Sequence, residues 1–376
     1  MDAIHSLLNH HKKLVRWAAL PHHQPSIAWI VRGEKGYWTP NSGLISHESL
    51  TNKQNQSLYE IASITKTMVA LRFAQGEQDG LWQASDSLAK LLPELEHIQL
   101  AHQVTLRQLA THTSGLPRLP KNISSTSIKA EKYNPYAAYD EALLIEALQQ
   151  QKLPTEPKHL YSNYGYGLLS WAMGKSSGID TAQALQQLLF HPLQMNETSM
   201  PTVTTDKSQT KTKATKKQKK NNPSSTIPGF APNGHSMPNW DFTTAMAGAG
   251  AVRSTMPDML TYIEAQLGQH PAAANLESAL LSCQHEQASV APSKGVGIGY
   301  AWMRSMRQDG TVTHWHNGAT YGASSFAAFN RDLQSGFVVL SNRGVSTMGA
   351  IKQMFGVGEL STDQVANLIG EQVFAP

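Results

Sequence analysis

The sequence is poor in cysteine, in charge and in long apolar runs. Its single cysteine, Cys283, excludes an intramolecular disulfide, and a small buried apolar residue is the role we expect for it. Charged residues make up 15% and hydrophobic residues 40% of the 376 residues, which is typical of a globular chain large enough for two lobes. No run of about eighteen apolar residues is present, so we expect no transmembrane helix.

The N-terminal segment lacks the features of a secretory leader. A basic start, an apolar core and a small-residue cleavage site do not follow one another, and charges interrupt residues 12–16. The sequence as written therefore predicts a cytoplasmic protein. A periplasmic or secreted protein is expected instead if a leader was removed.

Acidic residues are absent from residues 207–220, which hold seven lysines. Without this block the formal net charge falls from +4 to −3. Because the surrounding residues are almost all polar, we expect a disordered Lys-rich insertion at 204–225. An arm for nucleic acid or an anionic surface stays open as a second interpretation. No aromatic residue alternates with the lysines, so the sequence indicates no clear nucleic-acid partner.

The hydrophobic patterns predict strands at both ends of the chain and helices between them. The expected strands are Ser26–Val31, a strand near 37–38 after a turn at 33–36, and 297–302, 312–316, 325–329 and 336–341. The expected helices are 64–78, 85–92, 105–111, 138–149, 164–173, 181–190 and 362–373. We therefore predict an α/β (α+β) fold. Its antiparallel sheet, flanked by helices, would come from 1–64 and 246–376, with a mostly helical lobe, 65–245, inserted between them.

A serine and a lysine stand three residues apart at Ser63 and Lys66. Residues at this spacing share one face of a helix, so the amine can reach the hydroxyl. A desolvated neutral lysine can take the proton of a serine, which is otherwise a poor nucleophile. Three further segments accompany the pair: LRQLATHTSGL at 106–116, Tyr161-Ser162-Asn163 at a helix start, and His316-Asn317-Gly318 at a strand end.

With these motifs the chain resembles the serine β-lactamase and penicillin-binding superfamily, in its class C-like branch of β-lactamases, D-alanyl carboxypeptidases, D-aminopeptidases and esterases. The segments HPLQMNET at 191–198 and AGAGAVRST at 247–255 extend the likeness, which runs from about residue 27 to the last helix. The resemblance implies a β-lactamase/transpeptidase-like fold and a serine hydrolase that acts through an acyl-enzyme, without a metal or organic cofactor. A catalytically silent ligand-binding or scaffold protein is the alternative.

The resemblance also assigns roles to matching positions. Ser63 is the expected nucleophile and Lys66 its proton-handling partner. Tyr161 is expected to share acid and base duty, although a phenol with an ordinary pKa of about 10 needs a nearby cation for this. His112 belongs to a loop signature and is interpreted as structural.

Four positions are expected to hold the substrate, a small molecule or short peptide. Asn163 would bind an amide and help fix Lys66, and Gly318 would let the substrate lie against the strand. The backbone N–H groups of Ser63 and Ala319 would form an oxyanion hole. His316 stands where many β-lactamases carry lysine, and a histidine is mostly neutral at pH 7. We therefore expect an enzyme that acts on a D-amino-acid peptide or an ester in preference to an efficient β-lactamase. The oligomeric state stays open.

Two local patterns raise further questions. Residues 174–178 match the G-x-S-x-G elbow of other hydrolases, but a helix precedes them, so we expect a helix-ending turn. Arg72, Gln75 and Gly76 make the helix 64–78 more polar than a central helix should be. The sequence therefore does not show how the helix behind Ser63 packs in the core.

Overall fold

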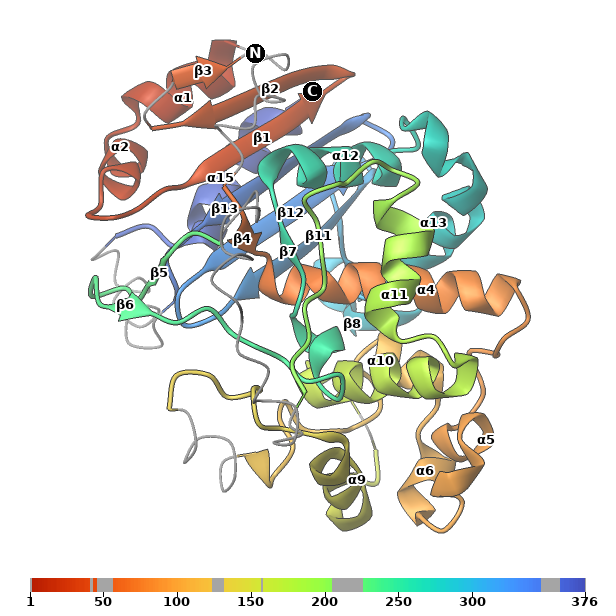
Figure 1. Cartoon of the computed structure of the whole chain (residues 1–376). Coiled ribbons are helices and arrows are strands. Elements are labelled where there is room, and N and C mark those ends of the chain that lie inside the picture. Colours follow the sequence, from red (N-terminus) through yellow and green to blue (C-terminus); the bar gives the residue numbers. More distant parts are fainter. Residues whose placement is uncertain are drawn as a thin grey trace.

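A computed structural model describes residues 2–40, 43–45, 57–123, 132–156, 158–204, 226–345 and 359–375. Nine strands form one antiparallel sheet in the order β3-β2-β1-β13-β12-β11-β10-β9-β8 (Figure 1). Their bounds are β1 (Ser26–Val31), β2 (Glu34–Thr39), β3 (Gly43–Ile45), β8 (Ala288–Ala291), β9 (Val296–Ile298), β10 (Met303–Met306), β11 (Val312–Ala319), β12 (Ser324–Asn330) and β13 (Ser335–Ser341). Because β1 pairs with β13, both ends of the chain build one sheet, and the predicted fold class is confirmed.

Two details of the predicted strands are wrong. The strand expected at 297–302 is two strands, since β9 ends at Ile298 and β10 begins at Met303. A Cβ atom at Gly299 would lie 2.0 Å from the carbonyl oxygen of Cys283, so this glycine lets the chain turn against α13 (Glu277–Gln284). The turn expected at 33–36 is shorter, because Arg32 and Gly33, both with positive φ, complete a two-residue hairpin loop.

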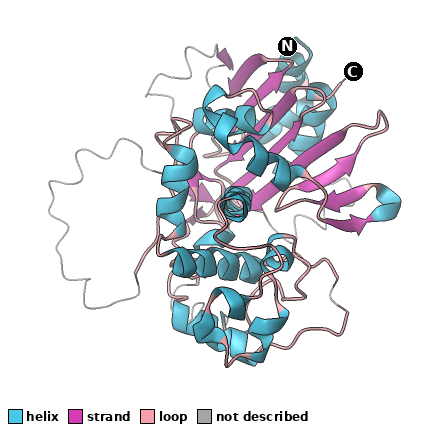
Figure 2. Ribbon diagram, turned by 90° about the vertical axis from the view of Figure 1, so that its right-hand side faces the viewer, coloured by secondary structure: helices cyan, strands magenta, loops and turns pink. Residues whose placement is uncertain are grey.

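The sheet lies between two helical layers (Figure 2). Side chains alternate along a strand, so β1 sends Ile27 and Trp29 to one core and Ala28 and Ile30 to the other. The first core is covered by α1 (Asp2–His10), α2 (Lys12–Ala18) and α15 (Thr362–Val373). The second joins the sheet to α12 (Met256–Gln266) and to the remaining helices.

The central helix α4 (Thr65–Gln78), seen end-on near the middle of Figure 2, packs on α13 and on α10 (Asn163–Ser177). The other helices are α5 (Leu88–Leu91), α6 (Gln99–Gln103), α7 (Leu106–Ala110), α9 (Glu141–Gln150) and α11 (Thr181–Leu185) with a π-helical turn (Gln186–Phe190). Short 3-10 segments are η2 (Ala62–Ile64), η3 (Pro93–Leu95), η6 (Ala247–Ala249), η7 (Pro271–Leu276) and η8 (Pro292–Lys294). Two small sheets pair β4 (Tyr59–Glu60) with β7 (Arg253–Ser254) and β5 (Gly229–Phe230) with β6 (Ser236–Met237).

Each predicted helical pattern contains a helix, whereas the patterns missed α1, α2, α6, α12 and α13. The division into 1–64 with 246–376 and 65–245 stays a prediction. The Lys-rich insertion at 204–225 lies, apart from Thr204, outside the described residues. Within the described ranges, no helix has the length and apolar character needed to cross a bilayer.

The polar residues of α4 have structural roles. The buried guanidinium of Arg72 donates hydrogen bonds to Thr181 Oγ1 (2.5 Å), Ser177 Oγ (2.8 Å) and the carbonyl oxygen of Ile179 (2.7 Å). These acceptors surround the end of α10, where Gly178 adopts a left-handed conformation (φ 69°). The expected helix-ending turn is therefore confirmed, and Arg72 fastens α4 to it.

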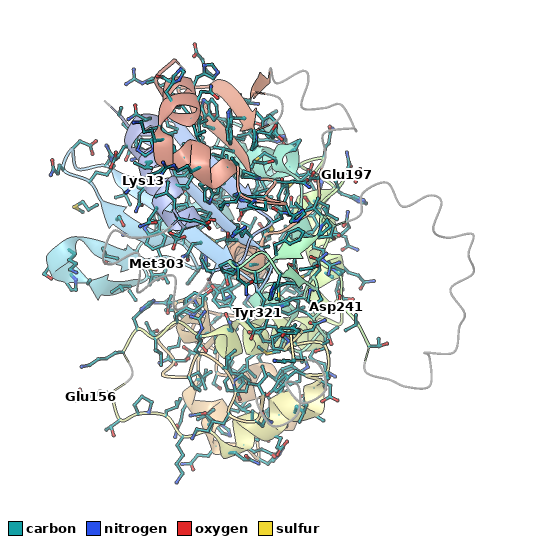
Figure 3. All side chains as sticks on the ribbon, turned by 90° about the vertical axis from the view of Figure 1, so that its left-hand side faces the viewer. Lys13, Glu156, Glu197, Asp241, Met303 and Tyr321 are labelled. Carbon is teal, nitrogen blue, oxygen red and sulfur yellow. The ribbon has the colours of Figure 1, made fainter. Side chains whose placement is uncertain are left out.

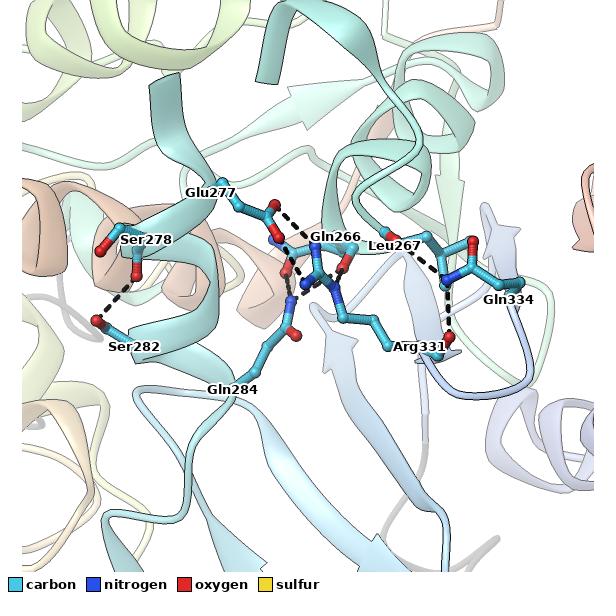
Figure 4. A network of polar contacts seen from close by, with 8 residues as sticks. All are labelled: Gln266, Leu267, Glu277, Ser278, Ser282, Gln284, Arg331 and Gln334. Carbon is cyan, nitrogen blue, oxygen red and sulfur yellow. Dashed lines mark hydrogen bonds and ion pairs between the residues drawn. The ribbon is translucent and has the colours of Figure 1, made fainter. Parts of the chain in front are cut away.

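A second polar network fastens the β12–β13 hairpin to the helices α12 and α13 (Figure 4). The guanidinium of Arg331 forms two hydrogen bonds with the Glu277 carboxylate, at 2.7 and 2.8 Å. It also donates to the carbonyl oxygen of Gln266. Cys283, on α13, is buried in the core shared with α4.

Candidate active site

Ser63 lies in a tight turn before α4. The short strand β4 leads into η2, where Ala62 has a positive φ of 46°, a conformation that residues with a Cβ seldom adopt. This turn leaves Ser63 half-buried on the wall of a cavity, while its neighbours Ile61 and Ile64 are buried. The strained backbone at Ala62 thus places the Ser63 hydroxyl on the cavity wall.

Lys66 is fully buried next to Ser63. Its Nζ donates hydrogen bonds to Ser63 Oγ at 3.0 Å and to the carbonyl oxygen of Ala249 at 2.6 Å. No acidic side chain in the described part of the chain is paired with this amine. Burial, and then the charge of Arg118, hold the pKa of Lys66 well below its usual value. The amine is therefore suited to take up a proton from Ser63.

Tyr161 lies beside both groups. Its ring centroid is 4.9 Å from Lys66 Nζ. Burial raises the pKa of Tyr161, whereas the Ser63 side chain and the charge of Arg118 lower it. The ring of His112 packs at 4.5 Å from that of Tyr161, and its Nδ1 accepts a hydrogen bond from the N–H of Ser162. His112 therefore fixes the segment that carries the phenol.

Asn163 begins α10 and is one of the residues that line the cavity. Its Nδ2 donates to the Tyr136 hydroxyl at 3.0 Å, whereas its Oδ1 is buried without a partner among the described residues. Its side chain makes no hydrogen bond to Lys66, whose second partner is Ala249 instead.

The end of β11 forms a second wall. β11 pairs with β10 only as far as Trp315, so residues 316–319 have a free edge at the cavity. A Cβ atom at Gly318 would lie 2.8 Å from the backbone nitrogen of Ser63 and 2.6 Å from the carbonyl oxygen of Ile61. The glycine therefore allows the strand to approach the turn that carries Ser63. Ala319 follows it on the cavity wall.

His316 is buried behind this wall. Its ring centroid lies 6.1 Å from that of Tyr161, and its Nδ1 lies 2.6 Å from the carbonyl oxygen of Asn317. Burial, and then the charge of Lys66, lower the pKa of His316 to about 3. The imidazole is therefore neutral at pH 7.

The cavity between these walls has a volume of about 460 Å³ and reaches well beyond Ser63. Four aromatic rings in mutual contact line it, those of Tyr136, Trp240, Phe242 and Tyr321. Figure 3 labels Tyr321 and Asp241, which lie near each other close to the centre of the view. Sequence reasoning missed these rings and Arg118, because they come from loops. The one sequence signal for Arg118 is its place directly after the HTSGLP segment.

Glu60 was also missed, although it holds together two segments that line the cavity. The N–H of Trp240 donates to its Oε1 at 2.5 Å, and the hydroxyl of Thr320 donates to its Oε2 at 3.0 Å. Burial raises the pKa of Glu60 to about 7, against the effect of these two hydrogen bonds. An acid within the apolar run before Ser63 was the available signal. In the described ranges, no group of three or more His, Cys, Asp or Glu residues could hold a metal ion.

Comparison with known proteins connects this geometry to one family. The beta-lactamase family model matches residues 22–354. The chain is similar to penicillin-binding protein 4* of Bacillus subtilis, with 32% identity over 39% of this chain and 31% of that protein. It is also similar to a beta-lactamase of Escherichia coli, with 29% identity over 46% of this chain and 42% of that protein. The alignments thus span less than half of these relatives.

Solved structures match over nearly the whole chain. A class C beta-lactamase mutant has a TM-score of 0.71 at 19% identity, over 98% of this chain and 95% of that one. The D-alanine carboxypeptidase AmpC from Burkholderia cenocepacia has a TM-score of 0.70 at 20% identity, over 94% of this chain and 98% of that one. At such identities the likeness establishes the fold alone.

Proposed function

The chain belongs to the beta-lactamase family, and on this basis we propose that it is a serine hydrolase acting through an acyl-enzyme on an ester or amide. The observation that carries the proposal is the buried amine of Lys66, 3.0 Å from the hydroxyl of Ser63. Burying an amine without an opposite charge is costly for stability, so a catalytic use is the better explanation for its position.

In the proposed reaction, Ser63 Oγ attacks the carbonyl carbon of the substrate and its proton passes to Lys66 Nζ. The carbonyl oxygen becomes an oxyanion that accepts hydrogen bonds from the N–H groups of Ser63 and Ala319. Tyr161 hands a proton to the leaving oxygen or nitrogen and regains it from Lys66. A water molecule then hydrolyses the ester of Ser63 by the reverse sequence, while Asn163 and Gly318 hold the substrate along β11.

We place a carboxylic ester or a short peptide ahead of a β-lactam as substrate. A lysine at position 316 would supply a fixed cation, whereas burial keeps His316 uncharged. The four aromatic rings of the cavity favour an apolar or aromatic acyl group.

The first test is covalent labelling and turnover. We expect a fluorescent penicillin or a phosphonate probe to label the protein, and Ser63→Ala to abolish labelling. We expect Lys66→Ala to lower kcat at least 100-fold on whichever substrate is turned over, p-nitrophenyl ester, chromogenic cephalosporin or D-alanyl peptide.

The exposed Ser176, from the G-x-S-x-G match, offers a matched control, because Ser176→Ala should leave labelling unchanged. Labelling that persists in Ser63→Ala would refute the proposed nucleophile. Absence of labelling and of turnover in the wild type would favour a catalytically silent binding protein.

A further inference from the structure

Arg118 carries the charge of the cavity. Of the described residues that line it, Arg118 is the only one with a formal charge at neutral pH, and no acidic side chain lines it. The guanidinium is exposed, and it has no hydrogen bond or ion pair with the described residues. A guanidinium presents donors in a planar fork that matches a carboxylate, and here those donors are free.

The backbone holds Arg118 in this place. Its carbonyl oxygen accepts hydrogen bonds from the N–H groups of Asn163 at 2.9 Å and Tyr164 at 3.2 Å, at the start of α10. Its Cζ lies 5.1 Å from the ring centroid of Tyr161. The cation is therefore stacked on the residue that, in the proposed reaction, protonates the leaving group.

The other basic side chains near Ser63 cannot supply a charge to the substrate. His316 is buried and directs Nδ1 at a backbone carbonyl. Lys66 is fully buried and already donates to Ser63 and Ala249. A negative charge on the substrate would thus find its partner in the loop that follows α7 instead of on β11.

We propose that Arg118 binds a carboxylate on the leaving group, so that the preferred substrates are esters or amides whose leaving group is anionic. The inference rests on the proposed serine hydrolase and specifies its substrate class. Because Tyr161 serves the leaving atom, the cation above its ring lies on the leaving-group side. Tyr321 belongs to the β11–β12 turn, and its ring lies 5.0 Å from that of Trp240, so this pair suits the acyl side.

A pair of esters that differ by one carboxylate tests this inference. The probes are a phenyl ester and the meta-carboxyphenyl ester of the same acyl group. We expect Arg118→Gln to lower kcat/KM on the meta-carboxyphenyl ester about tenfold, mostly through KM, and to change the phenyl ester less than about twofold. Arg118→Lys should retain part of the preference, and added KCl should reduce it in the wild type. Arg16→Gln, at an exposed arginine of α2, is the matched control and should change neither ester.

Three outcomes would overturn the inference. Equal losses on both esters in Arg118→Gln would mean that the cation acts through the field at Lys66 and Tyr161 instead of on the substrate. An unchanged ester preference in that variant would mean that another group binds the carboxylate. In both cases the proposed function would stand, provided that the wild type turns over the phenyl ester and Ser63→Ala abolishes this turnover. Absence of turnover of both esters by the wild type would overturn the proposed function and this inference together.

Discussion

At the scale of single residues, Gly318 sets how closely β11 approaches the nucleophile. We expect Gly318→Ala to lower kcat/KM on any turned-over substrate by at least about 100-fold, the effect of losing one oxyanion donor. The reason is steric, because the new methyl group would lie 2.6 Å from the carbonyl oxygen of Ile61 and must push the strand away. Steady-state kinetics measure the loss.

The control for this prediction is Gly174→Ala. Gly174 lies within α10, and a Cβ atom there would meet the backbone of Asp180 at an ordinary 3.5 Å, so turnover should stay normal and the unfolding midpoint should be equal or higher. Normal turnover in Gly318→Ala would show that the strand has room to spare.

The Ser63–Lys66 pair could be predicted at this scale from its spacing, whereas the other expected site residues came from the resemblance to the family. Ser63 and Lys66 belong to one short segment, so three residues of separation suffice to bring their side chains together. Arg118 and Glu60 could not be predicted in the same way. Their surroundings come from loops such as that of Trp240, 180 positions from Glu60, and only tertiary structure brings these together.

At the scale of elements, the junction of α4 with α10 and α11 depends on Arg72. Burial lowers the pKa of Arg72 to about 10, so the side chain is a buried cation at neutral pH. We expect Arg72→Met to lower the free energy of unfolding by about 3 kcal/mol, because the carbonyl and hydroxyl oxygens around it lose their donor. Urea unfolding followed by circular dichroism provides the measurement.

Arg16→Met, on the exposed side of α2, should change the same quantity by less than about 0.5 kcal/mol. If Arg72→Met lowered the free energy of unfolding no more than Arg16→Met does, water would have to donate to the oxygens that the Arg72 guanidinium contacts.

Elements with a strong apolar pattern were predictable, whereas elements whose position depends on contacts with a distant segment were not. Burial on both faces gives β12 and β13 the apolar runs FAAF and FVVL, and α15 has the same bounds as its pattern. By contrast α1 is a helix of nine residues whose apolar stripe consists only of Ile4, Leu7 and Leu8, and it is held by packing on α15 at the other end of the chain. The split between β9 and β10 depends on the carbonyl of Cys283, which no local pattern reveals.

At the scale of the whole molecule, buried histidines couple folding to pH. Burial lowers the pKa of His23 to about 4, of His314 to about 4 and of His316 to about 3. In the unfolded chain a histidine titrates near pH 6.5, so unfolding takes up protons between about pH 6.5 and 4. Their contribution to stability is therefore complete above pH 6.5 and is lost as the pH falls. Glu60, with its raised pKa, contributes in the opposite direction.

His23 tests this coupling, because it joins the turn after α2 to β13 through Trp17 O and Ser341 Oγ. We expect the stability advantage of the wild type over His23→Gln to be largest at pH 7 and to shrink by up to about 3 kcal/mol towards pH 4. Urea unfolding at a series of pH values gives this difference. The exposed His10→Gln is the matched control. An advantage that does not vary with pH would mean that the His23 ring has the same pKa in the folded and the unfolded protein.

The buried thiol of Cys283 on α13 can report how often the core around it opens. Burial raises the pKa of Cys283, and the helix that carries it packs on α4, the helix of Lys66. A sulfhydryl reagent can therefore reach the sulfur only when this packing opens. When the reagent is concentrated enough for capture to outpace reclosing, the rate of capture equals the rate of these openings, with or without turnover of a substrate.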